Sequence, residues 1–416
     1  MKLRLWILVG ILFLSIVFAV VTLKNERQKN AFKADLIELS DIKYGLFNVD
    51  EWKVMLAEII TKKVEEFDLN DANREKLRVK ISGFLTTTIG DLESRYYEEH
   101  NHTLFGQLQT GVAKLTGTFT QIKKDIPVFT EQILDFLEDE DNRKAMRGFV
   151  INKLDEYADS TFSKTDYSLV NGIVMKYEVA DLQSAKVLLT KYISDNSSKN
   201  RINKTFMVIL ALAVILLVLF AKNISQVELS IGLIISFIYL VVGVMLPMIE
   251  IDARISSITF TLLGEDIQFI DQVLYYKSKS ILAVVQLMIS QSRLDLLAVG
   301  VLVLTFSVLF PITKLICSAL FLHKPDSRKR PFISFMVFKS GKWSMADVMV
   351  IAIFMAYIGF DGIISEQLKQ IEDIATSLDL LTTNKSNLLF GFFSFTLFVL
   401  MSLFTSQKVQ SISEKK

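Results

Sequence analysis

Residues 205–248 read TFMVILALAVILLVLFAKNISQVELSIGLIISFIYLVVGVMLPM, two apolar runs separated by a short polar segment. Each run, 205–221 and 229–248, has about the length that an α-helix needs to cross the ~30 Å hydrocarbon core of a bilayer. The polar segment AKNISQVE between them is short enough to force the two helices to run antiparallel. This stretch therefore predicts a transmembrane helical hairpin.

Similar apolar windows occur on both sides of this hairpin. They lie at 3–23, 295–322 and 388–405, and residues 345–360 form a shorter sixth candidate. The composition agrees, since hydrophobic residues make up 51% of the 416 residues and the mean hydropathy is +0.39. We therefore expect an all-α polytopic membrane protein with six transmembrane helices, one N-terminal anchor followed by a C-terminal bundle of four to five helices.

The first window is expected to remain in the protein. It follows Met-Lys-Leu-Arg and runs directly into Lys24, without the small residues at alternate positions that a signal peptidase cleavage site requires. An uncleaved signal anchor over 1–23 is therefore favoured over a cleaved signal peptide.

Lysine and arginine in the short loops predict the orientation. The loop HKPDSRKRPFISFMVFKSGK (323–342) is strongly basic, so the positive-inside rule places it in the cytoplasm. Six spans then place both termini, including a tail at 411–416, in the cytoplasm. Residues 24–204, 249–294 and 361–387 are expected outside. The expected location is thus a bacterial inner membrane, with 24–204 in the periplasm.

The extracytoplasmic segments have their own patterns. Residues 24–204 contain long stretches with apolar residues every three or four positions, which predicts an α-helical domain. The polar stretch DNSSKNRINKT (195–205) is expected to be a short linker to the 205–410 membrane domain.

Beyond Pro247 the sequence MIEIDARISSITFTLLG alternates apolar with polar or charged residues, which predicts a small extracytoplasmic β-hairpin. Residues 265–289 are interpreted as a return to helical spacing. Their apolar half, 281–289, is too short to span and is expected to pack against the bundle or lie in the membrane interface.

Features of enzymes and metal sites are missing from the sequence. It has no Walker-type glycine loop, no G-x-S-x-G and no H-E-x-x-H, and its single cysteine, Cys317, excludes a cysteine-built zinc site. The histidines, His100, His102 and His323, are interpreted as surface residues. The net charge of +1 gives no indication of nucleic-acid binding. We expect no enzymatic activity, no cofactor and no metal.

Lys314 is the sharper signal, because an unpaired charge inside hydrocarbon costs at least a few kcal/mol. It lies three residues after Pro311, which is expected to kink the helix and free carbonyl groups. Two interpretations stay open: Lys314 pairs with a polar group inside the bundle, or it snorkels toward the cytoplasmic boundary at His323.

Asp347 has a local explanation. Ser344 and Asp347 form a capping-box-like S-x-x-D at the start of an apolar run, where the helix dipole favours an acid. Trp343 is typical of an interfacial anchor and Lys342 fits the positive-inside pattern. Helix initiation accounts for Ser344 and Asp347, and local physics alone accounts for every residue of this stretch.

Taken in order, these features resemble the membrane domain of the paraquat-inducible protein A family. The resemblance covers roughly 205–410, from MLPMIEI through VLFPITKLICSALFL and the basic loop to GKWSMADVMVIAIFMAYI. Pro311 and Lys314 match a weaker proline-then-lysine pattern. The specific part is the string G-[KR]-W-S-M-x-D-V, matched by Gly341, Lys342, Trp343, Ser344, Met345, Asp347 and Val348.

This resemblance implies an inner-membrane component of envelope integrity that loads or extracts phospholipid together with a partner of the mammalian-cell-entry (MCE) type. Lys314 and Asp347 would then form a polar pair within the membrane. The best-known members carry two such membrane domains and cysteine-rich zinc-binding segments, whereas this chain has one domain and one cysteine. The alternatives are a non-transporting scaffold or sensor that recruits a partner through 24–204, and a channel, which lacks the expected rings of charge.

Overall fold

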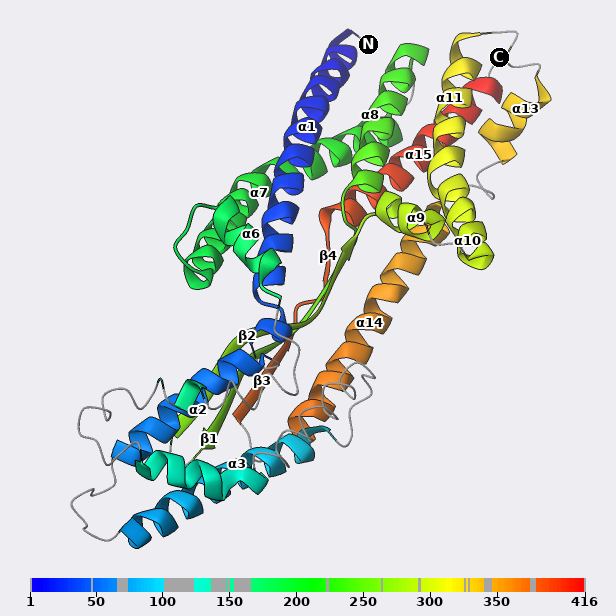
Figure 1. Cartoon of the computed structure of the whole chain (residues 1–416). Helices are drawn as coiled ribbons and strands as arrows, with labels where there is room; N and C mark the ends of the chain where they lie inside the picture. Colours follow the sequence, from blue (N-terminus) through cyan, green and yellow to red (C-terminus); the bar gives the residue numbers. More distant parts are fainter. Residues whose placement is uncertain are drawn as a thin grey trace.

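Figure 1 shows a computed structural model of the chain, in which helices dominate and a small antiparallel sheet extends from one end. The structure describes residues 2–45, 48–65, 74–100, 123–135, 148, 150–152, 166–221, 224–262, 265–290, 293–324, 327, 330–339, 346–374 and 379–414. Six helices within these residues are long and apolar enough to cross a membrane. The predicted polytopic helical fold with a β-hairpin is thus confirmed.

The elements follow one another along the chain with these bounds. The helices are α1 (Lys2–Leu39), α2 (Val49–Glu65), α3 (Arg74–His100), α6 (Ser168–Lys176), α7 (Leu182–Phe220), α8 (Gln226–Met245), α9 (Ile281–Ser290), α10 (Leu294–Leu304), α11 (Phe310–His323), α13 (Pro331–Ser334), α14 (Ala346–Ile374) and α15 (Phe390–Glu414). A 3-10 turn covers Ile42–Tyr44, and π-helical turns cover Thr305–Leu309 and Phe335–Lys339. The strands are β1 (Ile249–Leu262), β2 (Glu265–Lys279), β3 (Asp379–Asn384) and β4 (Asn387–Leu388).

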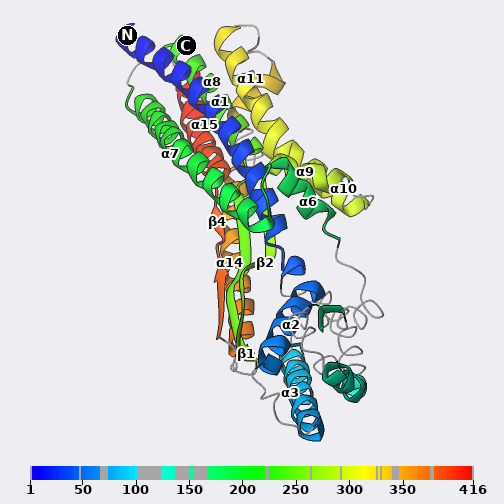
Figure 2. The ribbon, with the colours of Figure 1, turned by 60° about the vertical axis from the view of Figure 1, so that its left-hand side comes forward.

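A bundle of five candidate spans forms one end of the molecule. α1, α7, α8, α15 and the continuous unit α10–α11 surround one large apolar core, which includes Tyr239, Phe395 and Phe398. α8 begins at a capping box, in which the Ser225 N–H donates to Glu228 Oε2 at 2.8 Å and the Glu228 N–H donates to Ser225 Oγ at 3.2 Å. Both termini lie at the end of the bundle away from the sheet (Figures 1 and 2), as the predicted alternation of spans requires.

The helix α9 lies across the end of the bundle nearest the sheet (Figure 1). Its residues Ile281 and Val285 are buried in the main core, and it packs against α8 and α10. A Cβ at Gly300 of α10 would lie only 3.0 Å from the Met288 Cβ, so the two helices approach closely. The prediction that this segment packs against the bundle is confirmed.

The sheet has the strand order β2-β1-β3, and β4 also pairs with β1. All pairs are antiparallel, and the β1–β2 hairpin runs from Ile249↔Lys279 to Leu262↔Glu265. The prediction of helical spacing for 265–279 is therefore wrong. Ile267, Phe269 and Val273 are buried and lie an even number of residues apart along the strand. The segment forms a strand because its long pairing with β1 supplies a ladder of hydrogen bonds, which outweighs a weak helical pattern.

The predicted linker at 195–205 is also wrong, since α7 continues through it. The stretch contains neither proline nor glycine, and two of its polar side chains have a partner on α1. Asn200 Nδ2 donates to Glu26 Oε1 at 2.8 Å, and Lys204 forms an ion pair with the same carboxylate. α1 and α7 therefore stay together well beyond their apolar windows.

A second apolar core lies far from the bundle (Figure 2). It joins α2, α3 and the helical residues 123–135, and includes Ala57, Ile81, Leu85 and Ile133, each fully buried. The described parts of 24–204 are thus helical, as predicted. The boundaries of the predicted domains, and the periplasmic location of this one, stay predictions.

α14 is the exception among the candidate spans, because it packs along the sheet (Figures 1 and 2). Its first turns reach the bundle, where Met349, Val350 and Ile353 join the main core. Further along, Asn384 Nδ2 of β3 donates to the main-chain oxygen of Asp361 at 3.2 Å. The sequence predicts a membrane span over 345–360. In the structure, the first turns of α14 reach the bundle and the rest of the helix lies along the sheet.

Candidate functional site

The fourth span changes its helical geometry at its centre. Pro311 has no N–H to donate, and its ring conflicts with a regular α-helix through the preceding turn. The chain accommodates this residue with the π turn Thr305–Leu309, in which the Phe310 N–H donates to the oxygen of Thr305. Such π turns recur at functional sites. The break expected at Pro311 therefore takes the form of a π turn.

Lys314 lies on the buried face of α11. Its side chain is only 8% exposed, and Pro311, Ser318 and Phe321 share its face at helical spacing and are also buried. α11 packs against α8 and α15 on this side. Of the two open interpretations, this burial favours a position inside the bundle over a lysine that snorkels along the lipid.

The other motif residues are only partly described. Asp347 is the second residue of α14, and Val348 is 48% exposed. Gly341, Lys342, Trp343, Ser344 and Met345 lie outside the described residues, as does the side chain of Asp347. The capping role of Ser344 and the pairing of Asp347 with Lys314 therefore stay predictions.

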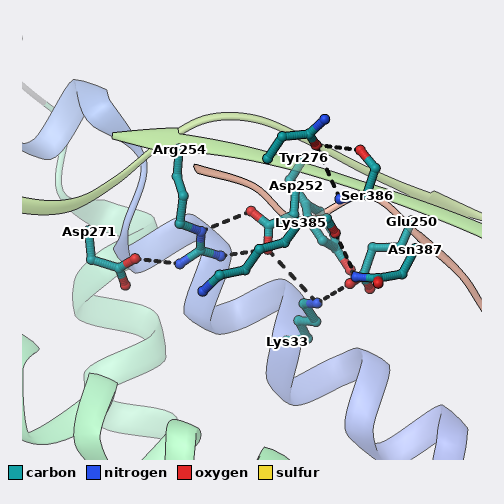
Figure 3. Close-up of polar contacts among 10 residues, drawn as sticks. Lys33, Glu250, Asp252, Arg254, Asp271, Tyr276, Lys385, Ser386 and Asn387 are labelled. Atoms are coloured by element: carbon teal, nitrogen blue, oxygen red, sulfur yellow. Dashed lines mark hydrogen bonds and ion pairs between the residues drawn. The ribbon is translucent and has the colours of Figure 1, made fainter. Parts of the chain in front are cut away.

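A charged cluster at the base of the sheet is the feature that sequence reasoning missed (Figure 3). Glu250, Asp252 and Arg254 occupy alternate positions of β1 and are all buried. Arg254 donates from Nε to Asp252 Oδ1 at 2.9 Å and from Nη2 to Asp252 Oδ2 at 2.7 Å, a bidentate pair. Its Nη1 donates to Asp271 Oδ1 of β2 at 2.5 Å. One guanidinium thus connects two strands.

Lys33 of α1 completes this cluster. Its Nζ lies 2.5 Å from Glu250 Oε1 and 4.0 Å from Asp252 Oδ2, and the Tyr276 hydroxyl donates to Glu250 Oε2 at 3.1 Å (Figure 3). Burial and the nearby charge of Glu250 raise the pKa of Tyr276 well above its usual value. The Tyr276 hydroxyl therefore stays protonated, and remains a hydrogen-bond donor, throughout the physiological pH range. The ion pair between Lys33 and Glu250 connects α1 to the sheet.

The buried charges of this cluster stabilise one another through ion pairs and hydrogen bonds. Burial alone lowers the pKa of Arg254, but its hydrogen bonds to Asp252 and Asp271 more than compensate, so its pKa is raised overall. Removing one partner from such a buried group leaves an uncompensated charge, which is costly. The arrangement suits a rigid connection between the bundle and the sheet.

The alternation in β1 contains a signal that points to this cluster. The alternation of apolar with polar or charged residues after Pro247 predicts a hairpin, but it assigns no role to the charged positions. The structure buries both faces at the strand base, because α1 continues outward past its apolar window and covers the charged one. The signal available in the sequence is an arginine preceded by two acids, Glu250 and Asp252, at alternate positions of one strand.

Comparison with known proteins bears on the fourth span and α14. Residues 270–369 match the family model described as paraquat-inducible protein A. Over these residues the chain is similar to paraquat-inducible protein A. The matched segment contains most of β2, α9, the fourth span and most of α14, and with them every motif residue from Pro311 to Val348. The matched range 270–369 is shorter than the range 205–410 over which the sequence motifs resemble the family. No curated protein and no solved structure matches the chain.

Proposed function

We propose that the protein is an inner-membrane component of envelope integrity that transfers phospholipid between the membrane and an MCE-type partner outside it. The paraquat-inducible protein A match over 270–369 carries this proposal, because it covers the fourth span and its buried Lys314. In the proposed orientation both termini and the basic loop face the cytoplasm, as the positive-inside rule favours. The sheet and the helical region beyond it then point toward the partner.

Lys314 is the residue that we expect to act on the lipid. A cation near a break in a transmembrane helix suits an anionic phosphate group, because opposite charges attract more strongly where water is scarce. Asp347, at the start of α14, is the other polar residue proposed to take part. Both residues lie within the segment 270–369 that matches the family model.

Substituting Lys314→Met is expected to remove most phospholipid that co-purifies with the detergent-extracted protein and to abolish rescue of envelope defects. Methionine keeps an apolar stem of similar length, so the packing around this side chain is largely preserved. The measurement is lipid mass spectrometry at matched protein yield. Lys324→Met is the control, because Lys324 is exposed just beyond the end of the same helix. Equal lipid content in the wild-type protein and both variants would rule out this role for Lys314.

A scaffold that recruits a partner through the region beyond the sheet is the second candidate, favoured by the separate core of α2 and α3. Residues 46–165 can be excised, because the rings of Tyr44 and Tyr167 lie 5.7 Å apart and a short linker can join Gly45 to Asp166. We expect this deletion to keep the co-purifying phospholipid and to lose crosslinks to the partner. Retained lipid supports transfer by the bundle. The scaffold is supported if the deletion loses the crosslinks and the full chain itself binds no lipid.

A further inference from the structure

α14 is apolar on the side away from the sheet as well as on its buried side, where Ile353 joins the main core. Asp361 is the one charged residue between Val348 and Ser365, and it faces β3, where Asn384 Nδ2 donates to Asp361 Oδ1 at 3.1 Å. A helix beside a sheet in water normally places its apolar residues inward and its charged residues outward. The outward face of α14 therefore requires an apolar neighbour.

This outward face is a continuous apolar stripe. Its side chains lie three to five residues apart over about 23 Å, at the 1.5 Å rise of an α-helix. Gly359 and Gly362 lie within it, and a Cβ at either position would meet no atom within 4 Å. The stripe ends at Glu366. Its exposed members are Val348 (48%), Ile351 (63%), Met355 (61%), Ile358 (49%) and Ile363 (61%).

The stripe continues an apolar surface of the bundle. The first turns of α14 contact the π turn of the fourth span, whose exposed residues Leu302 (54%) and Leu309 (50%) lie beside or within that turn. In a membrane, such exposed leucines face acyl chains. An apolar path therefore leads from the lipid-facing side of the fourth span onto α14 and along the sheet.

The size of the stripe argues against a second protein as its occupant. A stripe about 23 Å long and about 10 Å wide offers roughly 230 Å², well below the ~800 Å² that each partner buries in a stable interface. An acyl chain needs only a narrow apolar surface. The chemistry of the stripe, without any charge along its length, fits a hydrocarbon chain.

We propose that the outward face of α14 is a track for phospholipid acyl chains that extends beyond the bundle. This inference rests on the proposed function and gives the lipid a route along this chain. The polar headgroup stays in water while the acyl chains lie on Val348, Met355 and Ile363 in turn. The outer end of the track is level with the Asp361–Asn384 contact at the sheet.

Photocrosslinking tests this track. A benzophenone amino acid is placed at Met355 or Ile363, and the control position is Ile270 of β2, which is also apolar and 59% exposed but lies away from α14. After irradiation of whole membranes, mass spectrometry should detect phospholipid adducts at 355 and 363 at several times the yield at 270. Equal yields at all three positions, or adducts only with a second copy or another protein, would overturn the proposal.

Two further variants separate a track from simple burial in the bilayer. Met355→Cys, in a Cys317→Ser background, should react with a membrane-impermeant maleimide added outside spheroplasts, because Met355 lies inside the predicted span 345–360. No reaction would place the helix within lipid and contradict the track. Ile358→Glu should reduce the adduct at 363 several-fold, whereas Ile270→Glu should not. If phospholipid co-purifies with the protein and responds to Lys314→Met but no adduct forms on α14, the track fails while the proposed function stands.

Discussion

Replacing Arg254 with methionine is expected to lower the free energy of unfolding by about 3–5 kcal/mol, because it leaves a buried charge without its partner. Asp252 is 2% exposed and accepts both hydrogen bonds of the bidentate pair from Arg254. Lys33, 4.0 Å from Asp252, already binds Glu250 and is too distant to replace both hydrogen bonds. The variant should therefore show a markedly lower melting temperature in detergent.

Arg293→Met is the matched control for Arg254→Met. Arg293 also forms a bidentate pair with an acid two residues away, with Nη2 at 2.6 Å from Asp295 Oδ2, but the side chains are 72% and 62% exposed. Exposed ion pairs contribute about 0–1 kcal/mol, so this variant should melt close to the wild-type protein. Combining Arg254→Met with Asp252→Leu should recover much of the stability, since the unpaired acid is removed. Similar melting temperatures for both single variants would show that the buried cluster is not needed for stability.

The apolar windows could be predicted because a membrane imposes length and composition on each span. All six candidate spans were therefore recognisable from hydropathy alone. The end of α1 was not, since residues 24–39 carry the mixed charges of any solvated helix. Its continuation depends on Glu26 meeting α7 and Lys33 meeting β1, contacts that join residues far apart in the chain.

The sheet and α14 show a second limit of sequence reasoning. β2 has apolar residues at spacings compatible with either a helix or a strand, and only its long pairing with β1 decides. In α14, a run of apolar residues predicts a membrane span, but hydropathy does not indicate which neighbour the helix packs against. The inward position of Asp361 depends on Asn384, which follows it by 23 residues.

A methyl group at Gly391 is expected to disrupt the junction where the bundle meets the sheet. The Gly391 N–H donates to the oxygen of Pro247 at 3.2 Å, and a Cβ at this position would lie 2.4 Å from the oxygen of Leu246. These are main-chain atoms at the end of α8, so no side chain can rotate away to make room. Gly391→Ala should cost about 3 kcal/mol, at the upper end of overpacking effects.

The same helix crossing supplies a second variant and its control, both on α8. Gly243→Ala places a Cβ 2.7 Å from the Phe395 nitrogen of α15, whereas Gly232→Ala meets no atom within 4 Å. Alanine favours a helix over glycine by up to about 1 kcal/mol, so Gly232→Ala should stabilise the protein slightly while Gly243→Ala destabilises it. Melting temperatures in detergent measure both changes. If Gly243→Ala and Gly391→Ala melt at or above the wild-type temperature, α8 and α15 do not need this close approach, and the sheet is held to the bundle by its charged cluster instead.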